Sequence, residues 1–231
     1  MVNCRRKVWI ILLLLLLIIG RGRILAKEEM TAELMTIEEL KQQEEYTVAR
    51  LRGWITAKAS DVFMEDSTGG IELLFTNFKN RRYLVGSQVE VQGKLRWKPK
   101  NNVGYLSIDG EENFKTLGKR ISVSPMKIDP SEIEKELGRF VSIQNIKILE
   151  EGTEIRKLAQ SGDVKFYIYD MRKNGKLPLE VGDHIDEIQG IASDRGNFPH
   201  LCIRVLKDIG KITKPQSPIE PDEPEEKPID P

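Results

Sequence analysis

The sequence contains very little cysteine and histidine, with two residues of each among 231. This scarcity excludes a disulfide framework, a cysteine-rich zinc site and a multi-histidine metal centre, so we expect neither a metal nor a cofactor. The chain also lacks an excess of one charge, because 36 Lys+Arg balance 36 Asp+Glu. The overall charge therefore gives no indication that the protein binds nucleic acid. A composition of 39% hydrophobic and 31% charged residues is typical of globular domains and excludes a multi-pass membrane protein.

Long hydrophobic runs are limited to one, from Val8 to Ile19, directly after the basic residues 5–7. As a helix this run would span about 18 Å, short of the roughly 30 Å hydrocarbon core of a bilayer. Residues 1–26 are therefore predicted to be a signal sequence that ends at the small residue Ala26, and the protein to be secreted or extracytoplasmic. The alternative is an uncleaved segment that anchors the protein to the membrane.

The other end of the chain, residues 213–231, has no apolar periodicity and is rich in proline and acidic residues. Such a composition predicts a disordered tail. Without residues 1–26, which contain five basic and no acidic residues, the mature chain has 31 Lys+Arg against 36 Asp+Glu and is mildly acidic. Cys202 is then the remaining cysteine, and its apolar neighbours in sequence favour a buried thiol.

Between these ends the sequence repeats. The segment VGSQVEVQG at 85–93 matches VGDHIDEIQG at 181–190, and a Ser/Thr followed three residues later by Glu occurs at Thr36 and again at Ser131. The second pattern is the capping box of a helix start. Two domains of the same plan are therefore predicted, each a short helix followed by strands: residues 27–119 and residues 120–212.

The first copy shows its strands clearly. Apolar or small residues alternate with polar ones at 48–57 and 89–97, which predicts half-buried strands, and two shorter strands at 62–66 and 71–75 flank the turn Ser67–Gly70. Residues 105–109 are predicted to form the fifth strand. Five short strands favour a closed barrel, because a small open sheet would leave long unpaired edges.

The motifs LxGxI at 51–55, FMEDSTGGI at 63–71 and VGxxVxVxG at 85–93 resemble the OB-fold nucleic-acid-binding domain of the tRNA anticodon-binding type, as found in exported bacterial proteins. The resemblance implies an all-β chain with short helices, made of two tandem five-stranded OB-fold barrels. Residues 131–212 depart from the pattern: the glycine equivalent to Gly53 is absent, and the loops at 151–162 and 171–175 are longer. We expect a diverged second barrel.

An OB barrel usually binds its ligand on the outer face of its central strands and on nearby loops. A surface of cations and aromatic rings suits single-stranded nucleic acid, because lysine and arginine contact phosphates and aromatic rings stack on bases. In the first copy the candidates are Arg50, Arg52, Trp54, Lys94, Arg96, Trp97, Lys98 and Lys100. Two alternatives remain open: Trp97 is also in phase with the apolar residues of its strand, and basic residues are common on any soluble sheet.

The second copy offers a thinner set of candidates, flanked by the acidic residues Asp170 and Asp194. They are Lys165, Tyr167, Tyr169, Arg195 and Phe198.

No arrangement of residues typical of a catalytic site is present, since the two histidines share no metal-ligand spacing and the glycine-rich turn lacks the residues of a phosphate loop. We therefore expect an exported, non-catalytic tandem OB-fold protein that binds single-stranded nucleic acid or another polyanion. The alternative is a protein- or oligosaccharide-interaction module outside the cytoplasm. A third hypothesis, a domain pair acting beside a separately encoded nuclease, rests on analogy alone.

Overall fold

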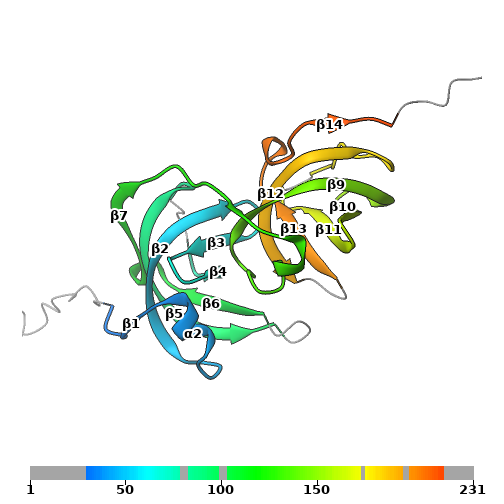
Figure 1. Cartoon of the computed structure of the whole chain (residues 1–231). Coiled ribbons are helices and arrows are strands. Elements are labelled where there is room, and N and C mark those ends of the chain that lie inside the picture. Colours follow the sequence, from blue (N-terminus) through cyan, green and yellow to red (C-terminus); the bar gives the residue numbers. More distant parts are fainter. Residues whose placement is uncertain (1–29, 79–82, 99–102, 173–174, 195–197, 216–231) are drawn as a thin grey trace, which may run out of the picture.

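The computed structural model describes residues 30–78, 83–98, 103–172, 175–194 and 198–215, and shows two β-barrels side by side (Figure 1). The predicted signal sequence, and residues 216–231 of the predicted tail, lie outside the described residues, whereas Thr213 of that tail is paired with His184 in a strand. The two ends of the described chain, β1 (Leu34–Met35) and β14 (Ile212–Thr213), lie at opposite ends of the molecule (Figure 1). In the described part of the chain, no helix is long and apolar enough to cross a membrane.

The first barrel is closed by five strands in the order β2-β3-β4-β6-β5, with β5 pairing back onto β2. All pairs are antiparallel except β4 with β6. Two further strands extend the sheet, β1 beside β2 and β7 beside β5. The elements are β1 (Leu34–Met35), α2 (Ile37–Lys41), β2 (Val48–Lys58), β3 (Val62–Glu65), β4 (Gly70–Thr76), β5 (Ser87–Trp97), β6 (Gly104–Asp109), a 3-10 helix (Glu111–Asn113) and β7 (Phe114–Arg120).

The second barrel repeats this arrangement, in the order β9-β10-β11-β13-β12 with β12 pairing back onto β9. The prediction of two tandem five-stranded barrels with short helices is confirmed, and the strand order of both is that of an OB fold. The elements are β8 (Met126–Lys127), a 3-10 helix (Pro130–Glu132), β9 (Phe140–Thr153), β10 (Arg156–Ser161), β11 (Val164–Asp170), β12 (His184–Asp194), β13 (Pro199–Ile203), a 3-10 helix (Leu206–Asp208) and β14 (Ile212–Thr213).

Each barrel has its own hydrophobic core, built from the inward side chains of alternating strands. In β2, Ala49, Leu51 and Ile55 are buried in the first core, whereas Arg50 and Arg52 point outward. The alternation is interrupted near Thr56, where the pairing of β2 with β3 shifts by one residue. After this bulge Ala57, predicted to face the first core, instead faces the second barrel.

The short helix α2 is capped by Thr36, where the predicted capping box is present: the Thr36 side chain accepts from the Glu39 N–H, and Glu39 accepts from the Thr36 N–H. Asp66, in the turn between β3 and β4, accepts from the Ile37 N–H at 2.8 Å and from the Thr68 and Gly69 N–H groups at 2.7 and 2.9 Å. One carboxylate therefore fixes both a turn and the start of the helix that packs over it.

Replacing Asp66 with alanine should lower the free energy of unfolding by about 1–2 kcal/mol, because it leaves a helix N-terminus and a turn without their acceptor. Urea denaturation measures the loss. Glu38→Ala, in the same helix, removes an exposed carboxylate and is the matched control. A loss in Asp66→Ala no larger than in Glu38→Ala would contradict this role.

The helix predicted at Ser131 in the second copy is wrong in type and start. The structure has only a three-residue 3-10 helix, whose cap is Asp129: its carboxylate accepts from the Ser131 N–H at 2.9 Å. Pro130 occupies the first turn, a position that suits proline because its missing N–H would be unpaired there. The start of the helix is therefore set two residues earlier than the Ser-Glu spacing indicates.

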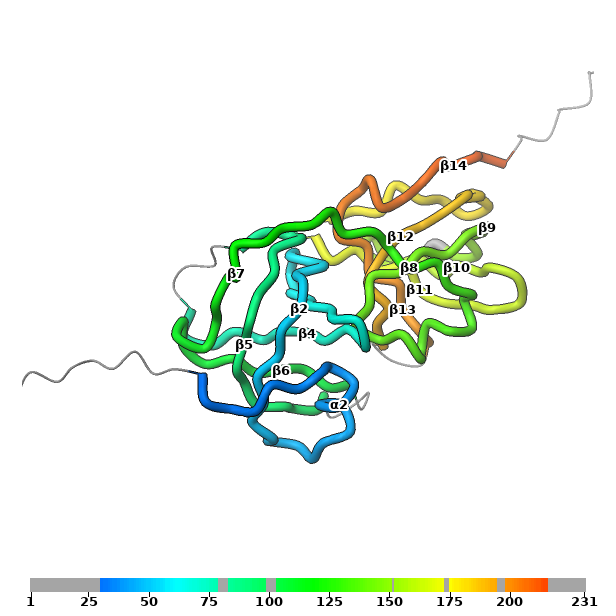
Figure 2. Tube along the Cα trace, turned by 60° about the vertical axis from the view of Figure 1, so that its left-hand side comes forward, coloured from blue at the N-terminus to red at the C-terminus, as the bar shows by residue number. Residues whose placement is uncertain are grey.

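The two barrels contact each other through a third hydrophobic cluster, called here the interface cluster. Its buried members are Ala57, Phe63, Phe140, Met171, Ile191 and Cys202. At the edge of this contact the backbones meet directly, since a Cβ added at Gly70 would lie 2.2 Å from the Gly138 carbonyl. The chain passes from one barrel to the other between β7 and β8 (Figure 2). The cluster and the backbone contact set the orientation of one barrel against the other.

Candidate nucleic-acid interface

Part of the outer face of the first barrel's central strands, where an OB barrel usually binds, is covered by the second barrel at β3 and at the end of β2. Phe63 of β3 points outward into the interface cluster and is only 3% exposed. Glu65, two residues further along the same face, accepts a hydrogen bond from the Phe140 N–H of the second barrel. This part of the first barrel is therefore an intramolecular contact.

Glu65 is half-buried in that contact and has no ion-pair partner among the described residues. Two guanidinium groups lie nearby, but each is held by another acid: Arg139 Nε lies 3.0 Å from Glu136, and Arg204 Nη2 lies 3.0 Å from Asp208. Burial raises the pKa of Glu65 to about 7, although the Phe140 N–H and the two arginines oppose this shift. The contact thus contains a carboxyl group whose charge is unfavourable in the folded protein.

The outward arginines predicted on β2 do share one face, but an acid on the neighbouring strand neutralises them. Arg52 donates from Nη2 to Glu90 at 2.7 Å, and Arg50 Nη1 lies 3.9 Å from the same side chain. Trp54 follows on this face and is half-buried. The three residues lie side by side, as predicted, with only part of their positive charge uncompensated.

The basic residues predicted on β5 are also largely paired. Arg96 Nε lies 3.4 Å from Glu45, and its guanidinium lies over the Tyr46 ring at 4.5 Å. Lys98 forms an ion pair with Glu72. Lys94 is exposed and has no ion-pair partner among the described residues.

The two remaining candidates of this set do not add to a surface patch. Trp97 packs against the first core, in agreement with the alternative interpretation of its phase, and Lys100 lies outside the described residues. The first barrel therefore presents a surface of mixed charge.

The corresponding face of the second barrel is partly exposed: Lys147, Lys165 and Arg156 are exposed, whereas Leu158, His200 and Cys202 are buried. Its cross-strand pairing arranges the side chains in three rows. Residues paired directly across strands share a face of the sheet, with strands about 4.8 Å apart. The first row is Lys147, Gln160 and Lys165; the second is Glu150, Leu158, Tyr167, His200 and Ser193; the third is Thr153, Arg156, Tyr169, Cys202 and Ile191.

Tyr167 is the centre of an aromatic and cationic group on this face. The Arg156 guanidinium lies 4.6 Å from the centre of the Tyr167 ring, the His200 ring lies at 5.1 Å and the Phe198 ring at 5.7 Å in an edge-to-face arrangement. His200 is held in place through Nδ1, which is 2.8 Å from the Phe198 carbonyl oxygen. Phe198 is 41% exposed and offers the most accessible ring.

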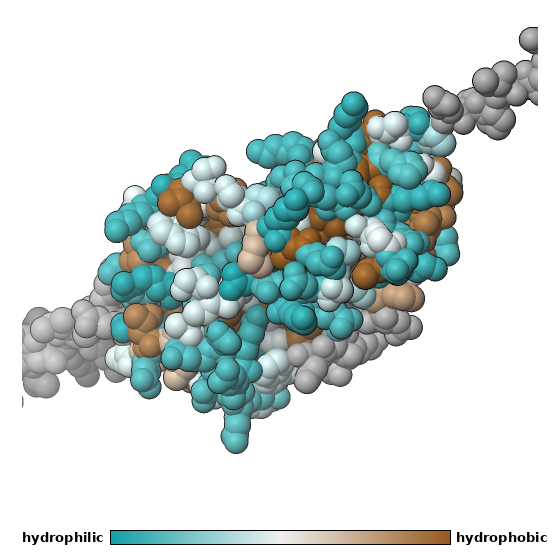
Figure 3. Space-filling model, in the orientation of Figure 1, coloured by the Kyte–Doolittle hydropathy of each residue, from teal (hydrophilic) through white to brown (hydrophobic). Residues whose placement is uncertain are grey.

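Positive charge flanks this group on one side. Lys147 and Lys165 are exposed, and neither forms an ion pair with another described residue. Glu150, at the β9 end of the second row, is an acidic residue on this face. The molecular surface shown in Figure 3 is predominantly hydrophilic on both barrels, with smaller apolar areas between polar side chains.

Of the remaining predicted residues, Lys165 and Tyr167 lie together on this face, as their alternation with the core residues Phe166 and Ile168 indicates. Tyr169 points the same way but packs against the interface cluster. Arg195 lies outside the described residues.

Sequence reasoning missed Lys147, Arg156, Gln160 and His200, mainly because residues 151–162 were expected to form a loop. Residues 151–162 instead form the end of β9, a turn and the strand β10. Both faces of β10 are buried at its centre, where Lys157, Leu158 and Ala159 are all covered, so the alternation that marks a half-buried strand is absent. The glycines at 152 and 162, which take positive φ angles of 54° and 57°, are the available signal, because they mark turns on both sides of the strand.

The described residues contain no group of three or more His, Cys, Asp or Glu side chains placed to hold a metal ion. What the second-barrel face provides is a cationic edge beside aromatic rings. Such a surface can bind phosphates and stack flat rings.

No protein-family model matches the chain, and no curated protein matches it. Three solved structures show what it is similar to. The hypothetical protein ygiW from E. coli is 17% identical, with a TM-score of 0.31 over 39% of this chain and all of that one. A murine DNA binding protein, solved with double-stranded DNA, is 12% identical, with a TM-score of 0.36 over 74% of this chain and 99% of that one. The p202 HIN2 domain is 9% identical, with a TM-score of 0.34 over 69% of this chain and 90% of that one. The assignment of both barrels to the OB fold rests on their own strand order.

Proposed function

We propose that this chain is an exported, non-catalytic binding protein that holds single-stranded nucleic acid, or another extended polyanion, on the outer face of β9, β10 and β11. The observation that supports this most strongly is the group around Tyr167, with Arg156 on its ring and Phe198 exposed beside it. Export rests on the apolar run at residues 8–19.

The arrangement matches the two kinds of contact that such a ligand needs. Lys147 and Lys165 lie in one row and can bind successive phosphates, whose contacts supply most of the sequence-independent affinity. Phe198 and Tyr167 can stack on bases, at about 1–3 kcal/mol per base. The mildly acidic average charge of the mature chain does not oppose local binding, because charges are screened beyond about 8 Å at physiological salt.

An oligosaccharide is the second candidate, favoured by a polar groove on the first barrel. The groove has a volume of about 420 Å³ and is lined by Asn77, Gln92, Asp109 and Asn113 beside the exposed Val48. Asn77 Nδ2 donates to Asp109 at 2.6 Å, and Gln92 Nε2 donates to Asn113 at 3.3 Å, so the amides are held in fixed positions. Neutral hydroxyl groups would suit this groove better than phosphates would.

Fluorescence anisotropy of the full-length chain in nonionic detergent, titrated with labelled single-stranded DNA and RNA, tests the proposal. We expect micromolar or tighter binding that weakens as salt rises. The double variant Lys147→Glu/Lys165→Glu should lose at least about tenfold in affinity, because two phosphate contacts become repulsive.

The matched control is Lys94→Glu/Lys119→Glu, which makes the same change of charge at two exposed lysines of the first barrel. It should change affinity less than about threefold, as expected of sites away from the ligand. Equal losses in both double variants would mean that the face is wrongly assigned. Absence of binding at low salt would overturn the proposal and favour the oligosaccharide.

A further inference from the structure

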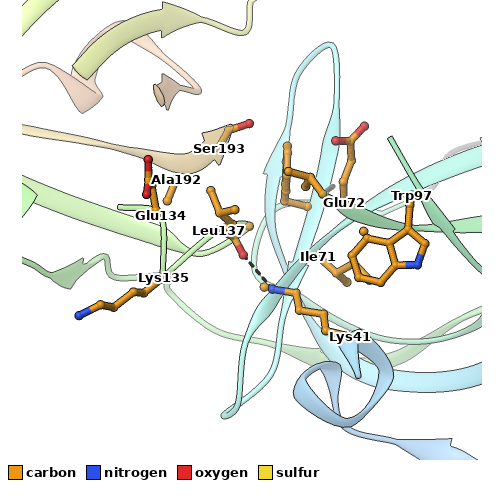
Figure 4. Close-up of a pocket in the computed structure, with 14 residues that line it drawn as sticks. Lys41, Ile71, Glu72, Trp97, Glu134, Lys135, Leu137, Ala192 and Ser193 are labelled. Atoms are coloured by element: carbon orange, nitrogen blue, oxygen red, sulfur yellow. Dashed lines mark hydrogen bonds between the residues drawn. The ribbon is translucent and has the colours of Figure 1, made fainter. Parts of the chain in front are cut away.

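A cleft of about 190 Å³ lies between the two barrels, next to the interface cluster. Ile71, Trp97 and Gly104 line it from the first barrel, and Leu137, Ala192 and Ser193 from the second. Figure 4 shows Trp97 and Ser193 on opposite sides of this region, with Lys41 of α2 reaching across to Leu137. The cleft is therefore formed only where the two barrels meet.

Lys41 closes one side of the cleft. Its Nζ donates to the Leu137 carbonyl at 2.9 Å, and burial lowers its pKa, with the neighbouring Arg139 acting in the same direction. The hydrogen bond joins the helix of the first barrel to the chain leading into β9. The shape of the cleft is thus fixed by a contact between the barrels before any ligand arrives.

The size and walls of the cleft suit a single flat ring. Sites that enclose whole small molecules usually measure about 300–1,000 Å³, so this cleft is too small for most of them. One wall is Trp97 beside Gly104, where an added Cβ would come 3.3 Å from the tryptophan ring and narrow the space. Polar groups also line the cleft: the Ser193 hydroxyl, the Glu72 and Glu134 carboxylates, and the side chains of Lys41 and Lys135. A nucleobase has this combination of flat apolar faces and polar edges.

The cleft also continues a row of the second-barrel face. Ser193 pairs with His200 across β12 and β13, and His200 pairs with Tyr167 across β13 and β11. Two strand spacings are about 10 Å, so the Tyr167 group and the mouth of the cleft are within reach of neighbouring nucleotides on one strand. His200 and Ser193 are only 2% and 7% exposed, so a ligand that leaves Tyr167 passes outside these two side chains on its way to the cleft.

We infer that a single strand bound at Tyr167 and Phe198 continues past the buried residues His200 and Ser193 and places one base in the cleft against Trp97. The inference rests on the proposed function and names its second contact. Binding then involves both barrels, although the second barrel covers part of the usual face of the first.

Photocrosslinking of the unsubstituted full-length chain gives the first test. Twelve-residue oligothymidylates, each with 5-iodouracil at one position, are irradiated on the protein, and the attached residues are identified by mass spectrometry. We expect crosslinks to Tyr167 or Phe198 from central positions and to Trp97 from positions near one end. Crosslinks confined to the second barrel would overturn the inference and leave the proposed function standing.

The second test compares oligothymidylates of four and twelve residues on Ser193→Leu, which adds bulk to the lining of the cleft, and on the control Thr116→Leu, at an exposed position of β7 in the first barrel. Ser193→Leu should bind the twelve-residue strand at least about fivefold more weakly and the four-residue strand normally, while Thr116→Leu binds both normally. An unchanged affinity of Ser193→Leu for the longer strand would contradict the cleft contact. Failure of the unsubstituted protein to bind either strand would overturn the proposed function itself.

Discussion

Replacing Glu65 with glutamine is expected to stabilise the protein by about 2–3 kcal/mol at pH 8 and to leave its stability nearly unchanged at pH 5. The carboxyl group lies between the barrels and accepts from the Phe140 N–H, and burial raises its pKa from 4.5 to about 7. A difference of this size corresponds to roughly 3 kcal/mol between the two protonation states. Glutamine keeps an acceptor for the N–H and carries no charge.

The sign follows from proton binding. Between pH 4.5 and about 7 the folded protein holds a proton on Glu65 that the unfolded chain has lost, so the contribution of this group to stability is complete below pH 4.5 and declines as the pH rises towards 7. Glu39 and Asp129 behave in the opposite way, because hydrogen bonds from Thr36 and Ser131 lower the pKa of each carboxyl group. The contributions of Glu39 and Asp129 to stability are lost only as the pH falls below about 4.5.

Urea denaturation at intervals from pH 5 to pH 8 measures the effect in the full-length chain. The difference between the unsubstituted protein and Glu65→Gln isolates this carboxyl group, because His184, His200 and all other groups are common to both. Glu44→Gln, which removes an exposed carboxylate, should follow the unsubstituted protein at every pH. A constant difference between Glu65→Gln and the unsubstituted protein across the range would show that Glu65 is ionised in the fold throughout.

The first barrel was predictable because most of its strands have one covered face. In β2 the buried residues Ala49, Leu51 and Ile55 alternate with outward arginines, and the period of two is visible in the sequence. β10 has no such signal, since its centre is covered on both sides. A strand covered on both faces can be predicted only from the turns at its two ends.

The contact between the barrels is reflected in the sequence by apolar residues at outward positions, which alternation alone does not explain. Val62 and Met64 belong to the first core, so Phe63 between them must point outward, yet it is an aromatic residue. Val141 likewise belongs to the second core, and Phe140 before it points away from that core. Consecutive apolar residues in a short strand indicate two covered faces. What covers the second face depends on how the domains pack, which the local sequence does not specify.

The neutralisation of the first-barrel candidates could not be seen in the sequence either. Glu90 lies 38 residues from Arg52, and Glu72 lies 26 residues from Lys98. Closure of the barrel brings each pair together. The segment 94–100 is free of acids along the chain but not in space. Local charge patterns predict which side chains face outward, and strand pairing decides which of these charges remain available.

Replacing Phe140 with alanine should cost about 3–5 kcal/mol, the usual range for removing a buried phenylalanine side chain. Phe140 is 1% exposed at the centre of the interface cluster, and the Arg204 guanidinium lies 3.3 Å from the centre of its ring. Arg204 also donates to the Thr56 carbonyl of the first barrel at 2.7 Å. Loss of the ring removes the packing of the interface and the cation–π contact that supports this hydrogen bond.

The reactivity of Cys202 distinguishes loss of the interface from loss of a core. Its thiol is fully buried in the interface cluster, so an alkylating reagent should modify it only when the barrels separate. Phe166→Ala is the matched control, because Phe166 is equally buried but lies inside the second core. Urea denaturation should show a similar loss of stability in both variants. Alkylation of Cys202 in native buffer, followed by mass spectrometry, should become at least about tenfold faster in Phe140→Ala alone. The reason is that the interface opens locally in that variant, without unfolding of a barrel. Equal rates in the two variants would mean that the barrels separate only when the second barrel unfolds, so that the interface would be part of that barrel's cooperative unit.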